Sequence, residues 1–148
     1  RHFGGTDEPE CRDGFYPCAF EPKENPFYVA LPYNDLDDSG ARKANAPSFI
    51  LGTVEGGGLK NRWVEVSSGE ATCFGQWEDV GPFEEDDYMY VFGDAAEPRN
   101  KIDERAGIDF SPAMRDCLGV GGVSKVRWRH AEARDVPSGP WQEVITIR

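Results

Sequence analysis

Three aspartates stand where a carboxylate could take part in chemistry. Asp35 follows the segment LPYN, Asp79 closes the run ATCFGQWED, and Asp109 stands in GIDFSP just before a helix start. Loops at the ends of strands often carry function, so carboxylates placed there can converge on one site. Hydrolysis of a glycosidic bond needs one protonated carboxyl and usually one ionised carboxylate. The three aspartates are therefore candidates for acid–base catalysis, while a turn or helix-start role is the simpler alternative for Asp79 and Asp109.

Several aromatic side chains could form flat surfaces for sugar rings. An exposed aromatic face suits the apolar face of a sugar, whereas a buried ring fills the core. The sequence leaves both interpretations open for each ring. The candidate substrate-binding residues are Tyr33, Asn34, Trp77, Tyr88 and Tyr90, with Trp141 as a further ring.

No segment predicts a metal, cofactor or nucleophile site. The stretch DLDDSG at 35–40 matches the first half of a calcium loop, but Ala46 stands where a bidentate Glu is needed. The acidic run 84–87 is typical of a solvated loop. GVGGV at 119–123 follows a helix rather than a strand, which excludes a phosphate loop. We therefore expect no metal and no cofactor.

The composition fits one acidic domain. The chain has 148 residues, which suits a single core. Its net charge of −11 at pH 7 argues against nucleic acid and anionic membrane surfaces, because both need a basic footprint. No apolar run approaches the roughly 18–20 residues that span a bilayer, so no membrane insertion is expected. We expect a monomer that acts on a neutral or cationic partner.

Four cysteines indicate disulfides rather than zinc. The chain has no Cys-x-x-Cys pattern, and it has only two histidines that could serve as further zinc ligands. Two disulfides are typical of exported proteins, so a secreted or extracytoplasmic location is expected. Three pairings are possible. We favour Cys11–Cys18, within a Pro-rich arm, and Cys73–Cys117, between a strand and a helix.

Alternating patterns and turn residues predict a β-rich fold. Ser111 is a candidate N-cap and Gly119 a candidate stop for a short helix over 112–118. On the strand that follows, Trp128 and His130 would point inward. The expected strands span 27–31, 48–54, 62–66, 71–79, 88–92, 124–130 and 141–147. Six or seven short strands with one short helix point to a small closed β-barrel.

The order of three segments resembles the double-psi β-barrel superfamily. From residue 59 the chain reads LKNRWVEVSSGEATCFGQWEDVGPF, then AGIDFSPAMRDCLG, then GVSKVRWRHA. This order is similar to the rare lipoprotein A group, where two strands run into Asp-x-Gly-Pro-Phe and an Ile-Asp-Leu/Phe-Ser segment opens a short helix. Expansins and glycoside hydrolase family 45 endoglucanases resemble it more distantly. The resemblance implies a six- to seven-stranded double-psi β-barrel with one short helix at 27–148, preceded by a disulfide-stapled arm at 1–26.

The resemblance also implies action on β-1,4-linked polysaccharide. Asp109 matches the position of the family 45 general acid, and Asp35 lies close to that of its base. Asp79 matches the acidic residue of the lipoprotein A Asp-x-Gly-Pro segment and would position or tune the pair. Asn34, next to Asp35, could take part if Asp35 points away. The expected activity is that of an inverting, endo-acting glycoside hydrolase similar to an endoglucanase. The alternatives are a peptidoglycan lytic transglycosylase of lipoprotein A type and a non-catalytic, expansin-like wall-binding module.

Overall fold

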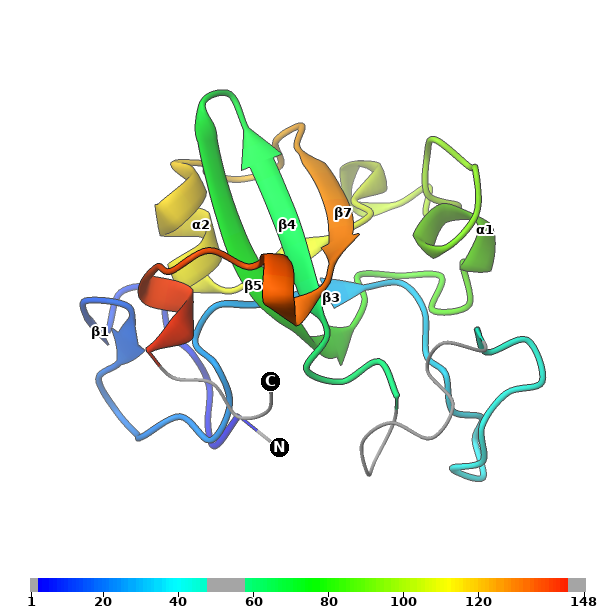
Figure 1. The fold of residues 1–148 in the computed structure, drawn as a ribbon, viewed down its shortest axis with the longest axis horizontal. Coiled ribbons are helices and arrows are strands. Elements are labelled where there is room, and N and C mark those ends of the chain that lie inside the picture. Colours follow the sequence, from blue (N-terminus) through cyan, green and yellow to red (C-terminus); the bar gives the residue numbers. More distant parts are fainter. Residues whose placement is uncertain (1–2, 48–57, 144–148) are drawn as a thin grey trace. The chain divides into compact units, whose positions relative to one another are not determined.

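The computed structural model describes residues 3–47 and 58–143. Its strands form two sheets, one of β1 and β2 and one of five strands in the order β6-β3-β5-β4-β7 (Figure 1). The strands are β1 (Arg12–Asp13), β2 (Tyr16–Pro17), β3 (Tyr28–Leu31), β4 (Trp63–Ser68), β5 (Ala71–Val80), β6 (Asp109–Phe110) and β7 (Arg127–Ala131). The helices are α1 (Tyr88–Val91) and α2 (Pro112–Leu118), with single 3₁₀ turns at Asp103–Arg105, Ala133–Asp135 and Pro140–Gln142. The described chain is mainly β, as the sequence predicts.

The chain folds into two compact units. Unit 1 comprises Arg1–Val29, Asn61–Glu78 and Phe110–Arg148, and unit 2 comprises Ala30–Lys60 and Asp79–Asp109. Unit 1 holds the N-terminal sheet, the β4–β5 hairpin, α2 and β7. Unit 2 holds α1 and the loops on which the candidate carboxylates lie.

The β4–β5 hairpin forms the centre of unit 1. The strands are antiparallel, and their register places Val66 opposite Cys73. Val64 and Val66 are fully buried, while Glu65 between them is half-buried. The two valines follow the period of two that places them on one face of the strand, while Trp63 on the other face is also buried. The strands predicted at 62–66 and 71–79 are therefore confirmed as an antiparallel pair.

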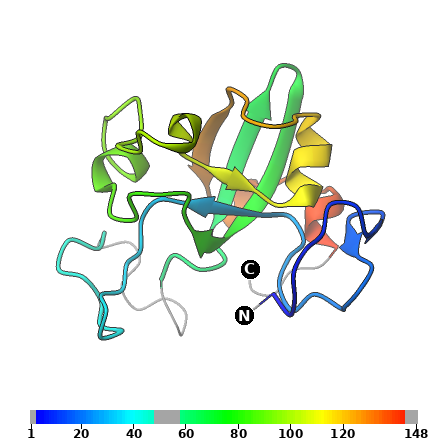
Figure 2. The same cartoon turned by 180° about the vertical axis from the view of Figure 1, so that it is seen from behind.

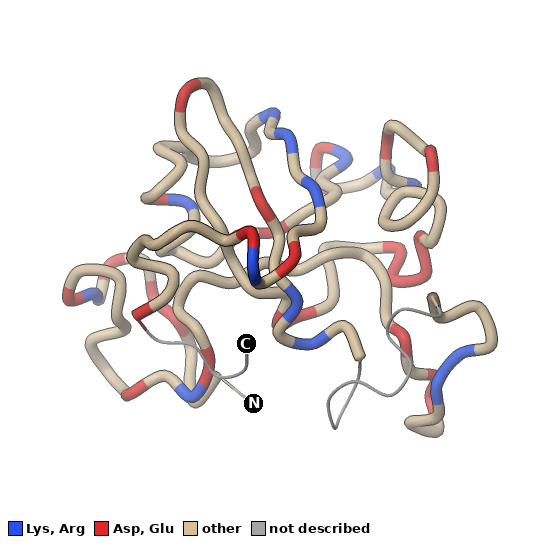
Figure 3. Tube along the Cα trace, in the orientation of Figure 1, with Lys and Arg blue, Asp and Glu red and all other residues tan. Residues whose placement is uncertain are grey.

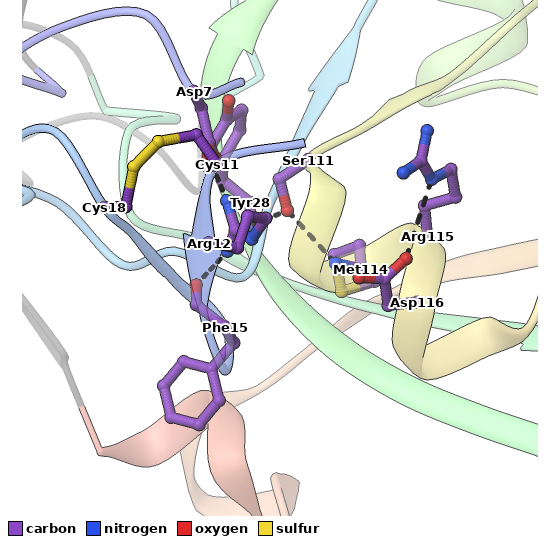
Figure 4. A network of polar contacts seen from close by, with 10 residues as sticks. All are labelled: Asp7, Cys11, Arg12, Phe15, Cys18, Tyr28, Ser111, Met114, Arg115 and Asp116. Carbon is purple, nitrogen blue, oxygen red and sulfur yellow. Dashed lines mark hydrogen bonds and ion pairs between the residues drawn. A yellow bond between two sulfur atoms is a disulfide. The ribbon is translucent and has the colours of Figure 1, made fainter. Parts of the chain in front are cut away.

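The predicted short helix is confirmed as α2. Ser111 caps it, because Ser111 Oγ accepts the N–H of Met114 at 3.2 Å, and Pro112 occupies the first turn. Gly119 ends the helix in the left-handed conformation. Ser111 Oγ also accepts the N–H of Tyr28 at 3.2 Å (Figure 4). One hydroxyl therefore starts the helix and anchors the beginning of β3.

Both predicted disulfides are confirmed. Cys11 pairs with Cys18 in the N-terminal sheet, and Cys73 on β5 pairs with Cys117 on α2. The second bond holds α2 beside the β4–β5 hairpin, as Figures 1 and 2 show. No cysteine in the described part of the chain is free.

The N-terminal residues contribute to the interior of unit 1. Asn25 is fully buried, and its Nδ2 donates to Gln76 Oε1 at 3.1 Å and to the Trp141 carbonyl at 2.7 Å. Its Oδ1 accepts the N–H of Phe27 at 2.9 Å. A buried amide must satisfy its polar atoms, and Asn25 does so by joining three distant segments. The segment expected as an arm thus supplies an interior hydrogen-bonding centre.

A buried ion pair organises the short N-terminal sheet. Arg12 binds Asp7, and the same guanidinium donates to the carbonyl of Phe15 (Figure 4). Burial raises the pKa of Asp7, while the neighbouring Arg12 opposes that shift. Together with Cys11–Cys18, this pair closes the N-terminal loop.

Three expectations from the sequence differ from the structure. Residues 88–91 form α1 rather than a strand, because Asp87 caps that segment as a helix. On β7, Trp128 is half-buried and His130 is exposed, so the inward direction predicted for His130 is wrong. The predicted strand 141–147 begins in the 3₁₀ turn Pro140–Gln142. Residues 144–147 and the predicted strand 48–54 lie outside the described part of the chain.

Within residues 3–47 and 58–143, no helix has the length and apolar character that crossing a membrane requires.

Candidate functional site

Asp79 lies at the exposed end of β5. Its Oδ1 accepts the N–H of Val80 at 2.9 Å, a local contact that leaves the residue exposed. The strand ends at Val80, and the N–H of Gly81 donates to the Leu31 carbonyl at 3.2 Å. The end of β5 is therefore held against the end of β3, and Asp79 stands on the solvent side.

Asp109 lies beside the same chain segment. It is exposed on the two-residue strand β6, and its Oδ2 is 3.7 Å from the position that a Cβ on Gly81 would take. Gly81 follows Asp79 by only two residues. The structure therefore brings the Asp109 carboxylate to the segment that carries Asp79, although 30 positions separate the two in sequence.

Asp35 has a different environment from the other two aspartates. It is only 6% exposed, and its Oδ2 accepts the N–H of Gly58 at 3.1 Å. Its backbone carbonyl accepts the N–H of Lys43 at 2.8 Å. Asp35 thus joins two loops of unit 2 through both its carboxylate and its backbone.

Backbone hydrogen bonds hold the loop after β3 against the acidic loop after β5. The N–H of Asn34 donates to the Glu85 carbonyl at 3.0 Å, and the N–H of Asp87 donates to the Pro32 carbonyl at 2.9 Å. Lys43 adds an ion pair to Asp86, with Nζ 3.1 Å from Oδ1. These contacts give the two loops a defined arrangement, because they satisfy backbone groups that would otherwise need water.

Tyr33 is a core residue of unit 2 rather than a sugar platform. It is fully buried, its ring packs edge-on against Tyr88 and Phe92, and its hydroxyl donates to Asn45 Oδ1 at 3.0 Å. Burial raises the pKa of Tyr33 to about 12, and the nearby carboxylates of Asp86 and Asp35 add to the shift. A ring with no exposed face cannot stack on a sugar.

The other proposed binding residues divide by burial. Trp77 is 2% exposed and belongs to the core of unit 1. Tyr88 and Tyr90 are half-buried, and the Tyr90 ring packs over Gly107. Asn34 is half-buried and uses its Oδ1 to accept the N–H of Leu36 at 3.0 Å. Only the two tyrosines keep partly exposed rings. Trp141, the further ring considered, is 8% exposed.

The loop that resembles a calcium site is closed by its own hydrogen bonds. Asp37 Oδ1 accepts the Ser39 N–H at 2.9 Å, the Ser39 hydroxyl at 2.6 Å and the Ala41 N–H at 3.0 Å. These bonds hold the pKa of Asp37 below its usual value. Among the residues that the structure describes, no group of three or more His, Cys, Asp or Glu side chains could hold a metal ion.

The acidic run 84–87 contains one residue that is not solvated. Asp87 is 1% exposed, and its Oδ2 accepts the N–H of Arg99 at 2.7 Å. Its Oδ1 accepts the N–H of Tyr90 at 3.4 Å and caps α1. This role was not predicted from the sequence, although an acid directly before a short apolar segment is a signal for it.

The segment that follows Asp79 is rich in exposed acids. From residue 79 to 109 the carboxylates described as exposed are Asp79, Glu84, Glu85, Asp86, Asp94, Glu97, Glu104 and Asp109. Figure 3 marks the acidic and basic positions along the chain. Arg99 lies near Glu84, with Nη2 3.2 Å from Oε2, but both side chains are more than half exposed. Arg99, Lys101 and Arg105 are also exposed in this segment, so its exposed carboxylates outnumber its exposed cations.

No protein-family model, curated protein or solved structure matches the chain.

Proposed function

We propose that the protein acts on a β-1,4-linked polysaccharide as an inverting, endo-acting glycoside hydrolase. The observation that carries the proposal is the approach of the exposed Asp109 carboxylate to Gly81, two residues after the exposed Asp79. Two solvent-facing carboxyl groups on adjacent segments are what acid–base cleavage of a glycosidic bond requires. Asp109 donates the proton to the leaving oxygen.

Asp79 fits the role of the base better than Asp35 does. A base that activates water must contact that water, and Asp79 is exposed. Asp35 is buried and already accepts the Gly58 N–H. We therefore assign Asp35 a positioning role, in which it holds the loop that follows β3.

The resemblance to double-psi β-barrels supports this proposal. The motifs that carry the resemblance place Asp79 at the end of β5 and Asp109 just before the Ser111 cap of α2. The five-stranded sheet has β3 between β5 and β6, so strands distant in sequence are neighbours. We propose the double-psi barrel as the fold on this basis.

The acidic segment 79–109 favours an uncharged glycan. A surface with an excess of one sign of charge repels a polymer of that sign and does not repel a neutral polymer. The exposed carboxylates of this segment, in a chain of net charge −11, therefore oppose binding of anionic polysaccharide. The two disulfides favour an oxidising compartment, which suits action on a glycan outside the cytoplasm.

A second candidate function is lytic cleavage of peptidoglycan. This reaction needs one acid and no base that activates water. The burial of Asp35 favours it, because the base expected from the resemblance does not face solvent. Product analysis separates the two reactions, since lytic cleavage leaves anhydro-sugar ends and hydrolysis leaves reducing ends.

The test measures product release from soluble and insoluble β-glucan, xylan, mannan and peptidoglycan. We expect Asp109→Asn to lower the rate by about 100- to 10,000-fold, the usual effect of removing a general acid. Asp79→Asn should lower it comparably, and Asp35→Asn should act mainly by weakening the fold. Asp116→Asn is a matched control, because Asp116 is an exposed aspartate on α2.

Two outcomes would contradict the assignment. Equal activity of wild type and Asp109→Asn on every active substrate would remove Asp109 as the acid. Binding to insoluble glycan with no soluble product, unchanged in Asp109→Asn, would instead indicate a non-catalytic wall-binding module.

A further inference from the structure

An exposed aromatic residue follows Asp79 by four positions, on the segment that the Asp109 carboxylate approaches. Phe83 is 44% exposed, and the other large apolar side chains exposed in the described chain are Met89, Ile102 and Val123. Phe83 is the aromatic member of this group. Aromatic side chains are large and rigid, and they bind apolar surfaces with little loss of conformational entropy.

The backbone on both sides of Phe83 is held in place. The N–H of Gly81 donates to the Leu31 carbonyl at 3.2 Å, and the Glu85 carbonyl accepts the N–H of Asn34 at 3.0 Å. Phe83 stands midway between these two bonds. The ring is thus presented to solvent from a loop anchored at both ends, so binding a ligand requires little additional ordering of the chain.

The distance from Phe83 to the carboxylates is bounded by the chain itself. Two residues span at most about 7 Å, so the Cα of Phe83 lies within about 7 Å of the Cα of Gly81. The Asp109 carboxylate lies against Gly81. Phe83 therefore stands within the length of a short oligosaccharide from the atoms proposed to react.

We propose that Phe83 is a sugar-stacking platform at a subsite beside Asp79 and Asp109. Its ligand is the apolar C–H face of an uncharged sugar ring. This inference rests on the proposed function and extends it, because it names the residue that holds the neighbouring sugar. A carboxylated or sulfated glycan fits the subsite poorly, since the exposed residues Glu84 and Glu85 follow Phe83 directly in the chain.

The test measures binding in the Asp109→Asn background, where turnover does not obscure affinity. The probes are β-1,4-linked gluco-, xylo- and manno-oligosaccharides of increasing length and the matching insoluble polysaccharides. We expect Phe83→Ala to weaken binding about tenfold, the effect of losing partial burial of one aromatic ring. Phe83→Trp should retain binding, because it keeps a flat apolar face.

The matched controls are Met89→Ala and Val123→Ala, which remove exposed apolar side chains from other segments. Both should bind as the parent does. In an otherwise wild-type chain, Phe83→Ala should raise KM and leave kcat nearly unchanged, because it removes binding that is equal in the ground and transition states. Unchanged urea midpoints check that every variant is folded.

The possible results separate this inference from the proposed function. Equal glycan binding by Phe83→Ala and its parent, or an equal loss in Val123→Ala, overturns the platform even if hydrolysis depends on Asp109. Binding that depends on Phe83 without any cleavage supports the platform and contradicts the hydrolase. If the parent binds none of the probes, both the platform and the proposed function are overturned.

Discussion

The carboxylate of Asp109 lies against the backbone of Gly81, with Oδ2 3.7 Å from the position of a Cβ on that residue. Gly81 has a φ of 156°, a conformation that residues with a side chain rarely adopt. It is buried, and its N–H is bonded to the Leu31 carbonyl. Because Gly81 has no side chain, the backbone just after β5 can lie close to the Asp109 carboxylate.

Gly81→Ala should therefore affect both stability and activity. The added methyl strains the backbone, which should lower the free energy of unfolding by about 1–3 kcal/mol. The strained segment lies against the Asp109 carboxylate, so its shift should move that carboxylate and lower the rate of glycan cleavage beyond the loss of folded protein. Urea unfolding and activity per folded molecule measure the two effects separately.

Gly69→Ala provides the control for this prediction. Gly69 also has a positive φ, 59°, but a Cβ there meets no atom within 4 Å. Its substitution should lower stability by about 1 kcal/mol and leave specific activity unchanged. A comparable fall in specific activity for both variants would show that backbone strain alone, and not contact with Asp109, controls activity.

Asp87→Ala should be strongly destabilising. The substitution removes a buried carboxylate and leaves the N–H groups of Tyr90 and Arg99 without that acceptor. We expect a loss of about 2–3 kcal/mol, the sum of a lost helix cap and a lost charged hydrogen bond. Glu85→Ala, an exposed neighbour, should change the urea midpoint very little. Similar effects of the two substitutions would contradict the assigned role of Asp87.

Tyr33 should make stability fall at high pH. The folded protein holds the phenol proton up to about pH 12, whereas the unfolded chain releases it near its ordinary value of 10. The contribution is therefore complete below pH 10 and is lost as the pH rises toward 12. Tyr33→Phe should be less stable at pH 7 by about 1 kcal/mol, because it loses the bond to Asn45. Its stability should depend less on pH between 10 and 12. Parallel curves for the two proteins in urea unfolding would contradict the prediction.

The two disulfides should differ in their contribution to stability. Cys73–Cys117 closes a loop of 44 residues and Cys11–Cys18 a loop of 7. Chain-entropy arguments then give about 4 kcal/mol for the first and about 2 kcal/mol for the second. Double alanine variants of each pair, compared by urea unfolding, test this order. A larger loss for the Cys11–Cys18 variant would show that native contacts of the N-terminal sheet dominate.

Local signals in the sequence were sufficient for several elements. The alternation around Val64 and Val66 predicts the β4–β5 hairpin, and Ser111, Pro112 and Gly119 together predict α2. These signals succeed because strand periodicity and helix caps depend on residues only a few positions apart. The favoured cysteine pairing, Cys11–Cys18 and Cys73–Cys117, is also confirmed, although the sequence allows three pairings.

Other features depended on contacts between distant residues. YMYVF has the composition of a strand, yet Asp87 caps it as α1 through a loop bonded to Pro32. Asp86 and Asp87 are adjacent and equally acidic, but one is exposed and the other buried. The N–H of Arg99, 12 positions further along the chain, donates to the buried Asp87 carboxylate and adds to this difference.

The candidate site shows the same division. The sequence alone identified Asp35, Asp79 and Asp109 as carboxylates near element ends, because residue type and spacing are local properties. Only the tertiary structure decided that Asp35 is buried against Gly58 while Asp109 reaches Gly81. It also decided that Tyr33 fills the core of unit 2 and that Phe83 faces solvent. Burial is a property of the packed chain, so residues of the same type take different roles according to which distant segments cover them.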